Sequence, residues 1–194
     1  RKKMRTLLGA LPLLAGLLAT TPRIAAAAET YIVDAVHSTV IFRAKHAGVG
    51  WTYGMFRGIS GTLKVDQRKP ANSSVEIVVD AASVFTNNKQ RDAHLRSPDF
   101  LNVKQYPKIT FRGNGVRKTG GDFEVKGTLS LHGTSRSIAV RFSRVGAGKG
   151  PKGKQLIGFE ATFSLRRSEY GMKNMIGPVS DVIELTVALE GVKK

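Results

Sequence analysis

The sequence predicts an all-β protein: an eight-stranded antiparallel barrel of lipocalin-like shape, with a short helical insertion near residues 87–101. Three observations point to this fold. Apolar and polar residues alternate with a period of two over many short segments. Turn-forming residues, mostly glycine, separate these segments. One stretch, 86–106, breaks the alternation and carries helix-capping residues instead.

The cleanest alternation lies between residues 123 and 131. Phe123, Val125, Gly127, Leu129 and Leu131 share one face there, and polar residues occupy the other. One face of this segment is apolar and the other polar, so we expect a half-buried strand. The same pattern predicts further strands at 31–33, 40–42, 56–63, 75–79, 109–111, 138–142, 157–165 and 183–189. A closed barrel needs about this many strands.

Turn signals fall between the predicted strands. They lie at 113–115, 120–122 and 132–133, and a Gly-rich stretch at 146–153 predicts a long hairpin. We find no internal repeat and no linker that would divide the chain after its N-terminal segment. The sequence therefore predicts one barrel domain.

The helical insertion has its own signals. Asn87 or Asn88 can cap a short helix, and Ser97-Pro98 predicts a second short helix that runs through Leu101. An insertion of this kind in a strand meander would cover one end of the barrel. We expect that arrangement here.

The N-terminus carries the parts of a secretory signal peptide. Residues 1–5 are mostly basic, 7–19 form an apolar run, and 26–28 are three alanines suited to cleavage. We expect a signal peptide at 1–28 and a barrel domain at 29–194. An uncleaved anchor is the weaker alternative, because the apolar run contains a proline and is shorter than the roughly 20 residues that span a bilayer.

The chain is strongly basic and lacks cysteine. Its formal net charge is +17, and removal of five basic residues with the leader leaves +12. A field of this sign attracts anionic membrane surfaces, pyrophosphate groups or nucleic acid, although a solvated basic surface explains it equally well. Export argues against nucleic acid as a partner. The absence of cysteine excludes disulfides, thiolate metal sites and a cysteine nucleophile.

An outer-membrane barrel would show similar alternation with the apolar face turned towards lipid. Three features favour a barrel with an apolar interior instead. Aromatic residues make up only 7% of the chain, the sequence ends in Lys193-Lys194, and basic residues are spread through the predicted loops.

Two groups of residues have the types needed for hydrolysis. Asp34, His37 and Ser38 are triad residue types, but neighbours on a strand alternate faces and no nucleophile elbow surrounds the serine. Asp92 and His94 form the second candidate, with the alternative that they join a hydrogen-bonded cluster holding the helical insertion to the barrel. The four histidines lack the spacing of metal ligands. We expect no catalytic residue, no metal and no cofactor.

Several ordered segments make the chain resemble the YceI-like family of periplasmic, lipocalin-like polyisoprenoid-binding proteins. The resemblance covers nearly all of the chain after its leader. It rests on Asp34 to Phe42 with His46 and Phe56-Arg57-Gly58, on Asn87 to Phe100, on Tyr106-Pro107 and Phe111, on Gly127 to Gly133, and on Arg167-Ser168 with Tyr170-Gly171.

The resemblance implies a periplasmic carrier, and not an enzyme, whose barrel holds a long isoprenoid chain such as an isoprenoid quinone or a prenyl pyrophosphate. Some members resemble binders of other lipids or amides, so ligand identity does not carry over. This chain departs from the family pattern in the loop expected at Gly50–Gly54 and in the basic hairpin at 146–153. Both departures concern the expected entrance to the barrel.

We expect the ligand to contact inward-facing apolar residues and, at its polar end, Arg91 or His94. The small residues Gly127 and Ala161 would leave room for it. The alternative is a barrel filled by its own side chains, with a basic surface that makes the functional contacts. Exposed strand edges could also support a homodimer. The predicted apolar contacts are Val40, Phe42, Phe56, Ile77, Phe85, Phe100, Phe111, Phe123, Phe142 and Phe163.

Overall fold

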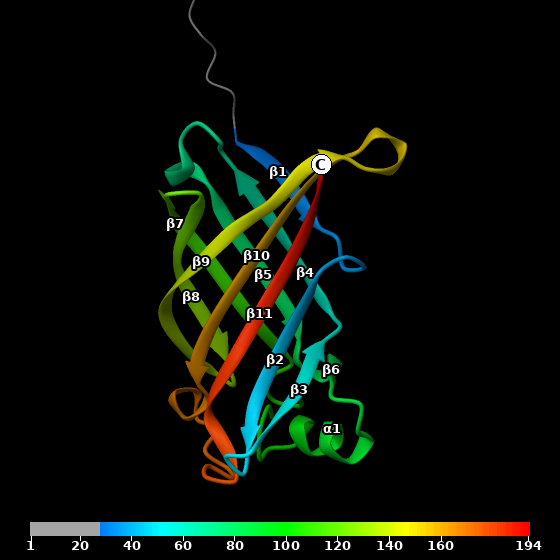
Figure 1. The fold of residues 1–194 in the computed structure, drawn as a ribbon, viewed down its shortest axis with the longest axis vertical. Coiled ribbons are helices and arrows are strands. Elements are labelled where there is room, and N and C mark those ends of the chain that lie inside the picture. The colour runs from blue at the N-terminus through cyan, green and yellow to red at the C-terminus, as the bar shows by residue number, and fades with distance from the viewer. Residues whose placement is uncertain (1–27) are drawn as a thin grey trace, which may run out of the picture.

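A computed structural model describes residues 28–194, which form one sheet of eleven strands. Residues 1–27, and with them nearly all of the predicted signal peptide, lie outside the described residues. Figure 1 shows the strands wound around a long axis, with one helix at the lower end. The strands are β1 (Glu29–Val33), β2 (Thr39–His46), β3 (Gly50–Phe56), β4 (Ile59–Val65), β5 (Ser74–Asp80), β6 (Val84–Phe85), β7 (Lys108–Thr119), β8 (Asp122–Leu131), β9 (Thr134–Lys149), β10 (Gln155–Arg166) and β11 (Val179–Lys193).

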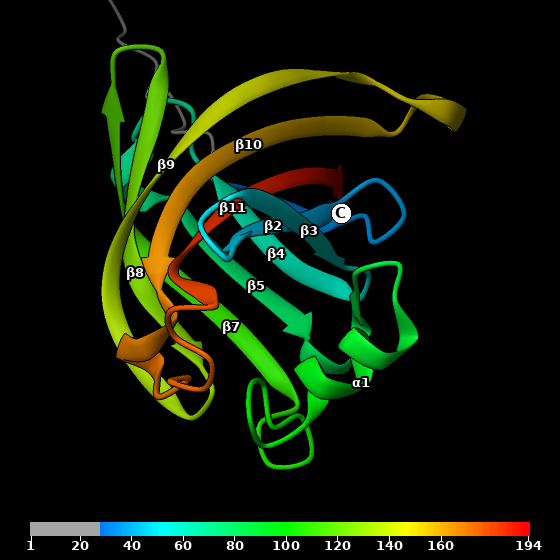
Figure 2. The same cartoon turned by 60° about the horizontal axis from the view of Figure 1, so that its bottom comes forward.

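Eight of these strands close into an antiparallel barrel, as predicted. Their order is β1-β4-β5-β7-β8-β9-β10-β11, and β1 pairs with β11 to complete the circle. β11 is long enough to pair with β2 over Val179–Ala188 and with β1 over Gly191–Lys193. The hairpin of β2 and β3 therefore extends the wall at the lower end of the barrel (Figures 1 and 2).

The helical insertion is shorter than the sequence predicted. One helix, α1 (Lys89–Arg96), is capped by the Asn88 side chain, which accepts a hydrogen bond from the Arg91 amide at 2.9 Å. The predicted second helix from Ser97 to Leu101 is wrong: this segment forms consecutive turns. Within residues 28–194, no helix has the length and apolar character needed to cross a membrane. The remaining helical turns are η1 (Pro70–Asn72), η2 (Ala81–Ser83), η3 (Pro151–Gly153) and η4 (Arg167–Tyr170).

Three other expectations need correction. The predicted strand 56–63 is divided between β3 and β4, and residues 50–54, expected as a loop, belong to β3. The turn expected at 113–115 is a bulge inside β7, where the register with β8 shifts between Gly113 and Gly115. Glycine supplies both turns and bulges, so its presence alone could not distinguish them.

The bulge lies where glycines on two adjacent strands, β7 and β8, are paired. Gly113 is the partner of Gly127 on β8, and the Phe111 ring lies directly over Gly127. The sequence predicted room for a ligand beside Gly127, but the Phe111 ring occupies that space. Ala161, the other small inward residue, is packed in the core and is 2% exposed.

Replacing Gly127 by alanine should destabilise the barrel by about 1–3 kcal/mol. The new Cβ would lie 2.5 Å from the Arg112 carbonyl oxygen and 2.8 Å from Cζ of Phe111, which is too close for either atom. Gly146→Ala is the matched control, since no heavy atom lies within 4 Å of its Cβ position. Chemical denaturation compares the two, and equal stability of both variants would refute this packing.

Candidate functional site

The lower half of the barrel encloses an apolar cavity of about 170 Å³. Every strand except β1 and β4 contributes residues to its walls, and residues from α1 and the turns after it close its lower end. All the residues that line it are apolar except one, Arg167. They are Val40, Phe42, Phe56, Ile77, Val79, Val84, Leu95, Phe100, Leu101, Ile109, Phe111, Leu129, Leu131, Ile138, Val140, Phe142, Phe163, Leu165, Arg167, Met172, Ile183, Leu185 and Val187.

A second cavity of about 180 Å³ occupies the other half of the barrel. Its inner wall is apolar and includes Phe123, Phe159 and Leu189, whereas basic residues such as Lys118 and Arg144 lie at its rim. Phe142 lines both cavities and is the only described residue that they share. Phe142 therefore lies between the two cavities.

Most of the apolar residues predicted from the sequence border one of these cavities. Phe123 lies on the second cavity, and Phe142 lies on both. Whether they touch a ligand remains a prediction. The others on the first cavity are Val40, Phe42, Phe56, Ile77, Phe100, Phe111 and Phe163.

Phe85, Arg91 and His94 are not among the residues that line either cavity. Phe85 packs beneath the Arg57 guanidinium, whose Cζ lies 3.5 Å from the ring centroid. Arg91 donates from Nε to the Thr86 hydroxyl at 2.7 Å and from Nη2 to the Thr86 carbonyl at 2.8 Å. His94 bonds Asp99 at 2.9 Å. The polar groups of Arg91 and His94 therefore serve the helical insertion, and their contact with a ligand stays untested.

The helical insertion is held to the barrel mainly by charged side chains. Asp92 is buried and accepts hydrogen bonds from the amide and the hydroxyl of Thr86, at 2.8 and 2.6 Å. Arg96 donates to the carbonyl oxygens of Ala82 and Val84. These bonds fix α1 beside β6, which places Leu95 and Phe100 at the lower end of the cavity.

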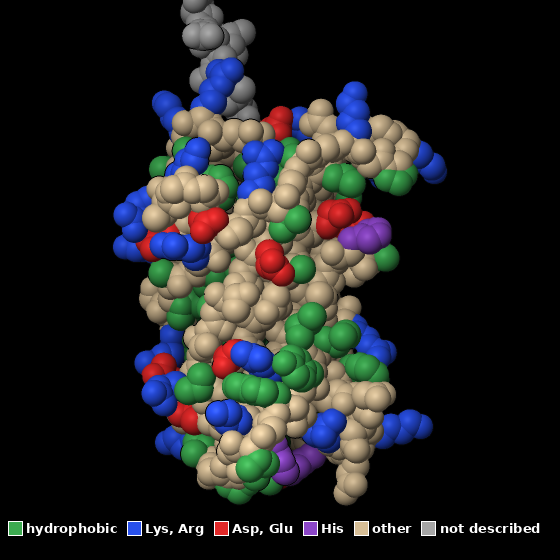
Figure 3. Space-filling model, viewed as in Figure 1, with side chains coloured by type: hydrophobic (Ala, Val, Ile, Leu, Met, Phe, Trp, Pro, Cys, Tyr) green, Lys and Arg blue, Asp and Glu red, His purple; other side chains and the backbone are tan. Residues whose placement is uncertain are grey.

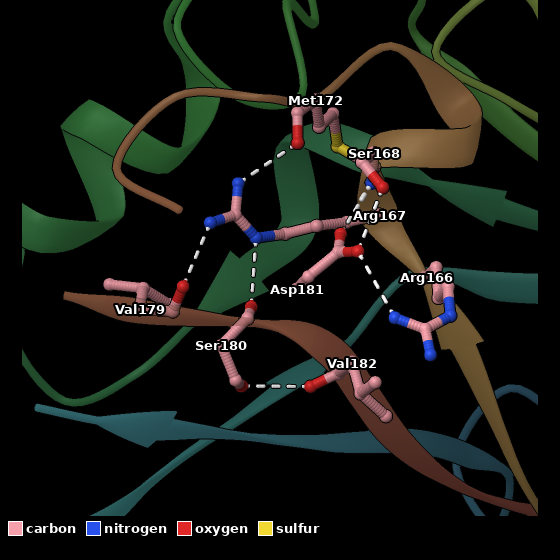
Figure 4. Close-up of polar contacts among 8 residues, drawn as sticks. All are labelled: Arg166, Arg167, Ser168, Met172, Val179, Ser180, Asp181 and Val182. Atoms are coloured by element: carbon pink, nitrogen blue, oxygen red, sulfur yellow. Dashed lines mark hydrogen bonds and ion pairs between the residues drawn. The ribbon is translucent and has the colours of Figure 1, made fainter. Parts of the chain in front are cut away.

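Arg167 was not predicted as a site residue, although it borders the first cavity (Figure 4). Its side chain is 3% exposed, and burial lowers the pKa of its guanidinium from the ordinary value. Nε donates to the Ser180 carbonyl, and Nη1 donates to the carbonyls of Met172 and Asn174. Nη2 donates to the carbonyl of Val179 at 3.1 Å.

The strand register contains a signal for Arg167 that the sequence interpretation missed. Residues 161, 163 and 165 of β10 were predicted to point inward, and 167 is the next position in that series. Arg166, the intervening residue, has a side chain that is 61% exposed and pairs with Asp181 at 3.6 Å. The signal was therefore an arginine at an inward-facing position that follows apolar ones. It would have pointed to Arg167, the one charged residue that lines the first cavity.

Side chains of both candidate hydrolytic groups are bonded to other partners. His37 Nδ1 bonds Asp34 at 2.9 Å, but the Ser38 hydroxyl is occupied by backbone groups of Glu190, as acceptor at 2.9 Å and donor at 3.3 Å. Asp92 bonds Thr86 and His94 bonds Asp99, so those two side chains do not pair with each other. Both groups have structural partners instead.

Asp34, His37 and Glu190 form one cluster whose ligand atoms lie within 4.8 Å of one another, the only group so spaced in the described part of the chain. The hydrogen bond that His37 donates to Asp34, with attraction from both carboxylates, raises the pKa of His37, and the same bond lowers the pKa of Asp34. A metal needs the neutral imidazole, which a raised pKa disfavours. The geometry is that of an exposed ion pair.

Comparison with known proteins agrees with this architecture. Residues 31–191 match the model of the YceI-like domain. Protein YceI of Escherichia coli O17:K52:H18 (strain UMN026 / ExPEC) is 36% identical over 171 residues, covering 87% of this chain and 90% of that protein. A UPF0312 protein of Azotobacter vinelandii is 38% identical over 172 residues, with the same shares covered.

Solved structures show the same fold. BcnA of Burkholderia cenocepacia superposes with a TM-score of 0.75 at 23% identity, over 81% of this chain and 98% of that one. The YceI protein of Campylobacter jejuni gives 0.69 at 30% identity, over 77% and 90%. A polyisoprenoid-binding domain from Saccharophagus degradans gives 0.67 at 18% identity, over 84% and 98%. With a family match over most of its length, this chain belongs to the YceI-like family.

Proposed function

We propose that this chain is a periplasmic carrier that holds one isoprenoid-type lipid inside its barrel. The observation that carries the proposal is the apolar cavity, with walls supplied by the barrel strands and a floor supplied by the helical insertion. At roughly 25 cal/mol per Å², burying ~300 Å² of apolar ligand surface would contribute about 7 kcal/mol. The polyisoprenoid-binding title of the Saccharophagus domain supports the same ligand class.

The basic surface of the protein favours its attraction to an anionic lipid bilayer. Lys and Arg side chains are spread over the face seen in Figure 3 and over both ends of the barrel. The hairpin of β9 and β10 projects beyond the barrel, and Lys149, Lys152 and Lys154 are exposed on it (Figure 2). Basic residues near an anionic bilayer each contribute about 1 kcal/mol to attraction. Export through the predicted signal peptide would bring the carrier to membranes that contain isoprenoid lipids.

Native mass spectrometry tests the carrier directly. The protein is purified without detergent from the organism that makes it, and bound material is extracted and identified. We expect one long-chain isoprenoid lipid per chain, because the walls offer shape and apolar surface but few polar groups. Repeated recovery of an empty barrel would contradict the proposal and favour the alternative of a basic surface as the functional part.

Phe142 should control the length of chain that binds. Each cavity alone is smaller than the roughly 300–1,000 Å³ of common ligand sites, but the two joined would reach that range. Phe142→Leu removes part of the ring between the two cavities, so the ratio of affinities for a C20 over a C10 isoprenoid should rise. Phe163→Leu is the matched control, because it removes the same volume from a residue that borders only the first cavity.

Equilibrium dialysis below the critical micelle concentration measures both affinities for each variant. An equal change in the C20-to-C10 ratio for Phe142→Leu and Phe163→Leu would show that Phe142 does not divide the interior. The free energy of unfolding serves as a check, since shortening either ring should cost no more than about 3 kcal/mol.

We further propose that the protein is not an enzyme and that the Asp34–His37 pair is structural. The pair exists while His37 is protonated, so it persists below the raised pKa of His37 and is lost as the pH rises through that value. Asp34→Asn should return the His37 pKa towards its ordinary value, and Glu190→Gln should lower it less, since that carboxylate is 3.8 Å away. NMR titration of the His37 ring reads both, and an unchanged pKa in Asp34→Asn would disprove the pairing.

A further inference from the structure

Arg167 places a positive charge at the edge of an apolar cavity without an acidic partner. Its four hydrogen bonds all end on backbone carbonyls of the segment between η4 and the start of β11. Within residues 28–194, no carboxylate lies within 4.0 Å of this guanidinium. A buried charge is normally paired, because neutral dipoles replace only part of the lost hydration.

The nearest candidate counter-ion is already engaged. Asp181 accepts hydrogen bonds from the amide and the hydroxyl of Ser168, both at 2.8 Å, and pairs with the exposed Arg166 (Figure 4). Its charge acts on Arg167 only at longer range. The charge of Arg167 therefore remains uncompensated by a direct ion pair.

The guanidinium of Arg167, a residue that borders the first cavity, also keeps one N–H donor. Arginine has five N–H donors, and four of those of Arg167 have partners in the described part of the chain. The one left over is on Nη2. Cζ lies 5.7 Å from the ring centroid of Phe100, which also lines the first cavity. A ligand in this end of the cavity would thus lie against an apolar wall that Arg167 borders.

We propose that Arg167 receives the head group of the ligand, and that this head group is a carboxylate. The inference rests on the proposed function and adds to it the chemical class and orientation of the ligand: an acidic amphiphile lies with its head beside Arg167 and its tail towards Phe142 and the second cavity. One guanidinium balances one negative charge. A doubly charged phosphate would leave a net charge in an apolar chamber, and a hydrocarbon would leave the arginine unpaired.

A second possible site for the anionic head group lies at the opposite end of the barrel. Lys118 and Arg144 line the rim of the second cavity, and both are exposed. Their charges are hydrated and screened, so they attract anions without requiring one. Arg167 differs because it is 3% exposed, so bulk solvent hydrates and screens its charge much less.

The experiment compares geranylgeranoic acid with geranylgeraniol, which share a C20 tail and differ in the head group. Equilibrium dialysis at a pH where the acid is ionised gives both affinities for the wild-type protein. A charge-assisted hydrogen bond in a buried site should make the acid bind at least about tenfold more tightly. Equal affinities would overturn the inference while leaving the carrier proposal intact, whereas binding of neither compound would count against the carrier proposal itself.

Three variants locate the head group. Arg167→Met should abolish the preference for the acid, and Arg166→Gln, which changes the exposed neighbour, should retain it. The double variant Lys118→Gln/Arg144→Gln alters only exposed rim residues, so it serves even if Arg167→Met fails to fold. Retention of the preference in the rim variant supports a head group at Arg167. Its loss there, or its survival in a folded Arg167→Met protein, would overturn the assignment.

Discussion

The structure depends on the double pairing of β11. This strand joins β10 along most of its length on one edge, and on the other it meets β2 first and β1 afterwards. The pairing with β1 closes the barrel, so the edges of β1 and β11 are not free. A free edge could otherwise pair with a strand of another chain. The pairing of β11 also fixes which residues face inward. Leu185 and Val187 are placed opposite Phe42 and Val40, and all four line the same cavity.

The lower end of the barrel must provide both apolar cavity walls and hydrogen-bond donors for backbone carbonyls. The cavity needs apolar walls, but the segment from η4 to β11 turns back on itself and leaves backbone carbonyls without partners from a strand. Arg167 supplies four of those carbonyls with donors at once. The same residue that satisfies the turn therefore also borders the cavity with a charged side chain. A neutral side chain of similar length could fill the space but could not satisfy as many carbonyls.

The sequence predicted the barrel well because its signal is repeated in every strand. The alternation along β8 and β10 placed the inward residues correctly, and the turn at His132-Gly133 has the positive φ values of a tight hairpin, 50° and 74°. Features determined by contacts between distant residues were harder to predict. The bulge at Gly113 depends on Gly127 across the sheet, and the end of α1 depends on bonds that Leu95 and Arg96 carbonyls accept from the turns that follow.

The candidate site shows the same division. Period-two alternation identified apolar residues that border the cavities, because facing inward is a property of each strand alone. It could not identify the role of Phe142, which depends on where the ring ends relative to both cavities. Arg91 and His94 were predicted to make a polar contact because they are polar residues of the helical insertion, but their partners Thr86 and Asp99 are local. Arg167 lies on the correct register at the far end of a strand.

A barrel with an empty apolar interior gives up part of the packing free energy that a filled core would supply, because the lining atoms lack neighbours on one side. The strands tolerate this loss because their backbone hydrogen bonds are independent of what fills the interior. Phe142 borders both cavities, and packed side chains bound each of them. A long ligand that displaced this ring would restore the missing contacts along the whole axis. The packing free energy gained in this way would then become part of the affinity for a chain long enough to reach both cavities.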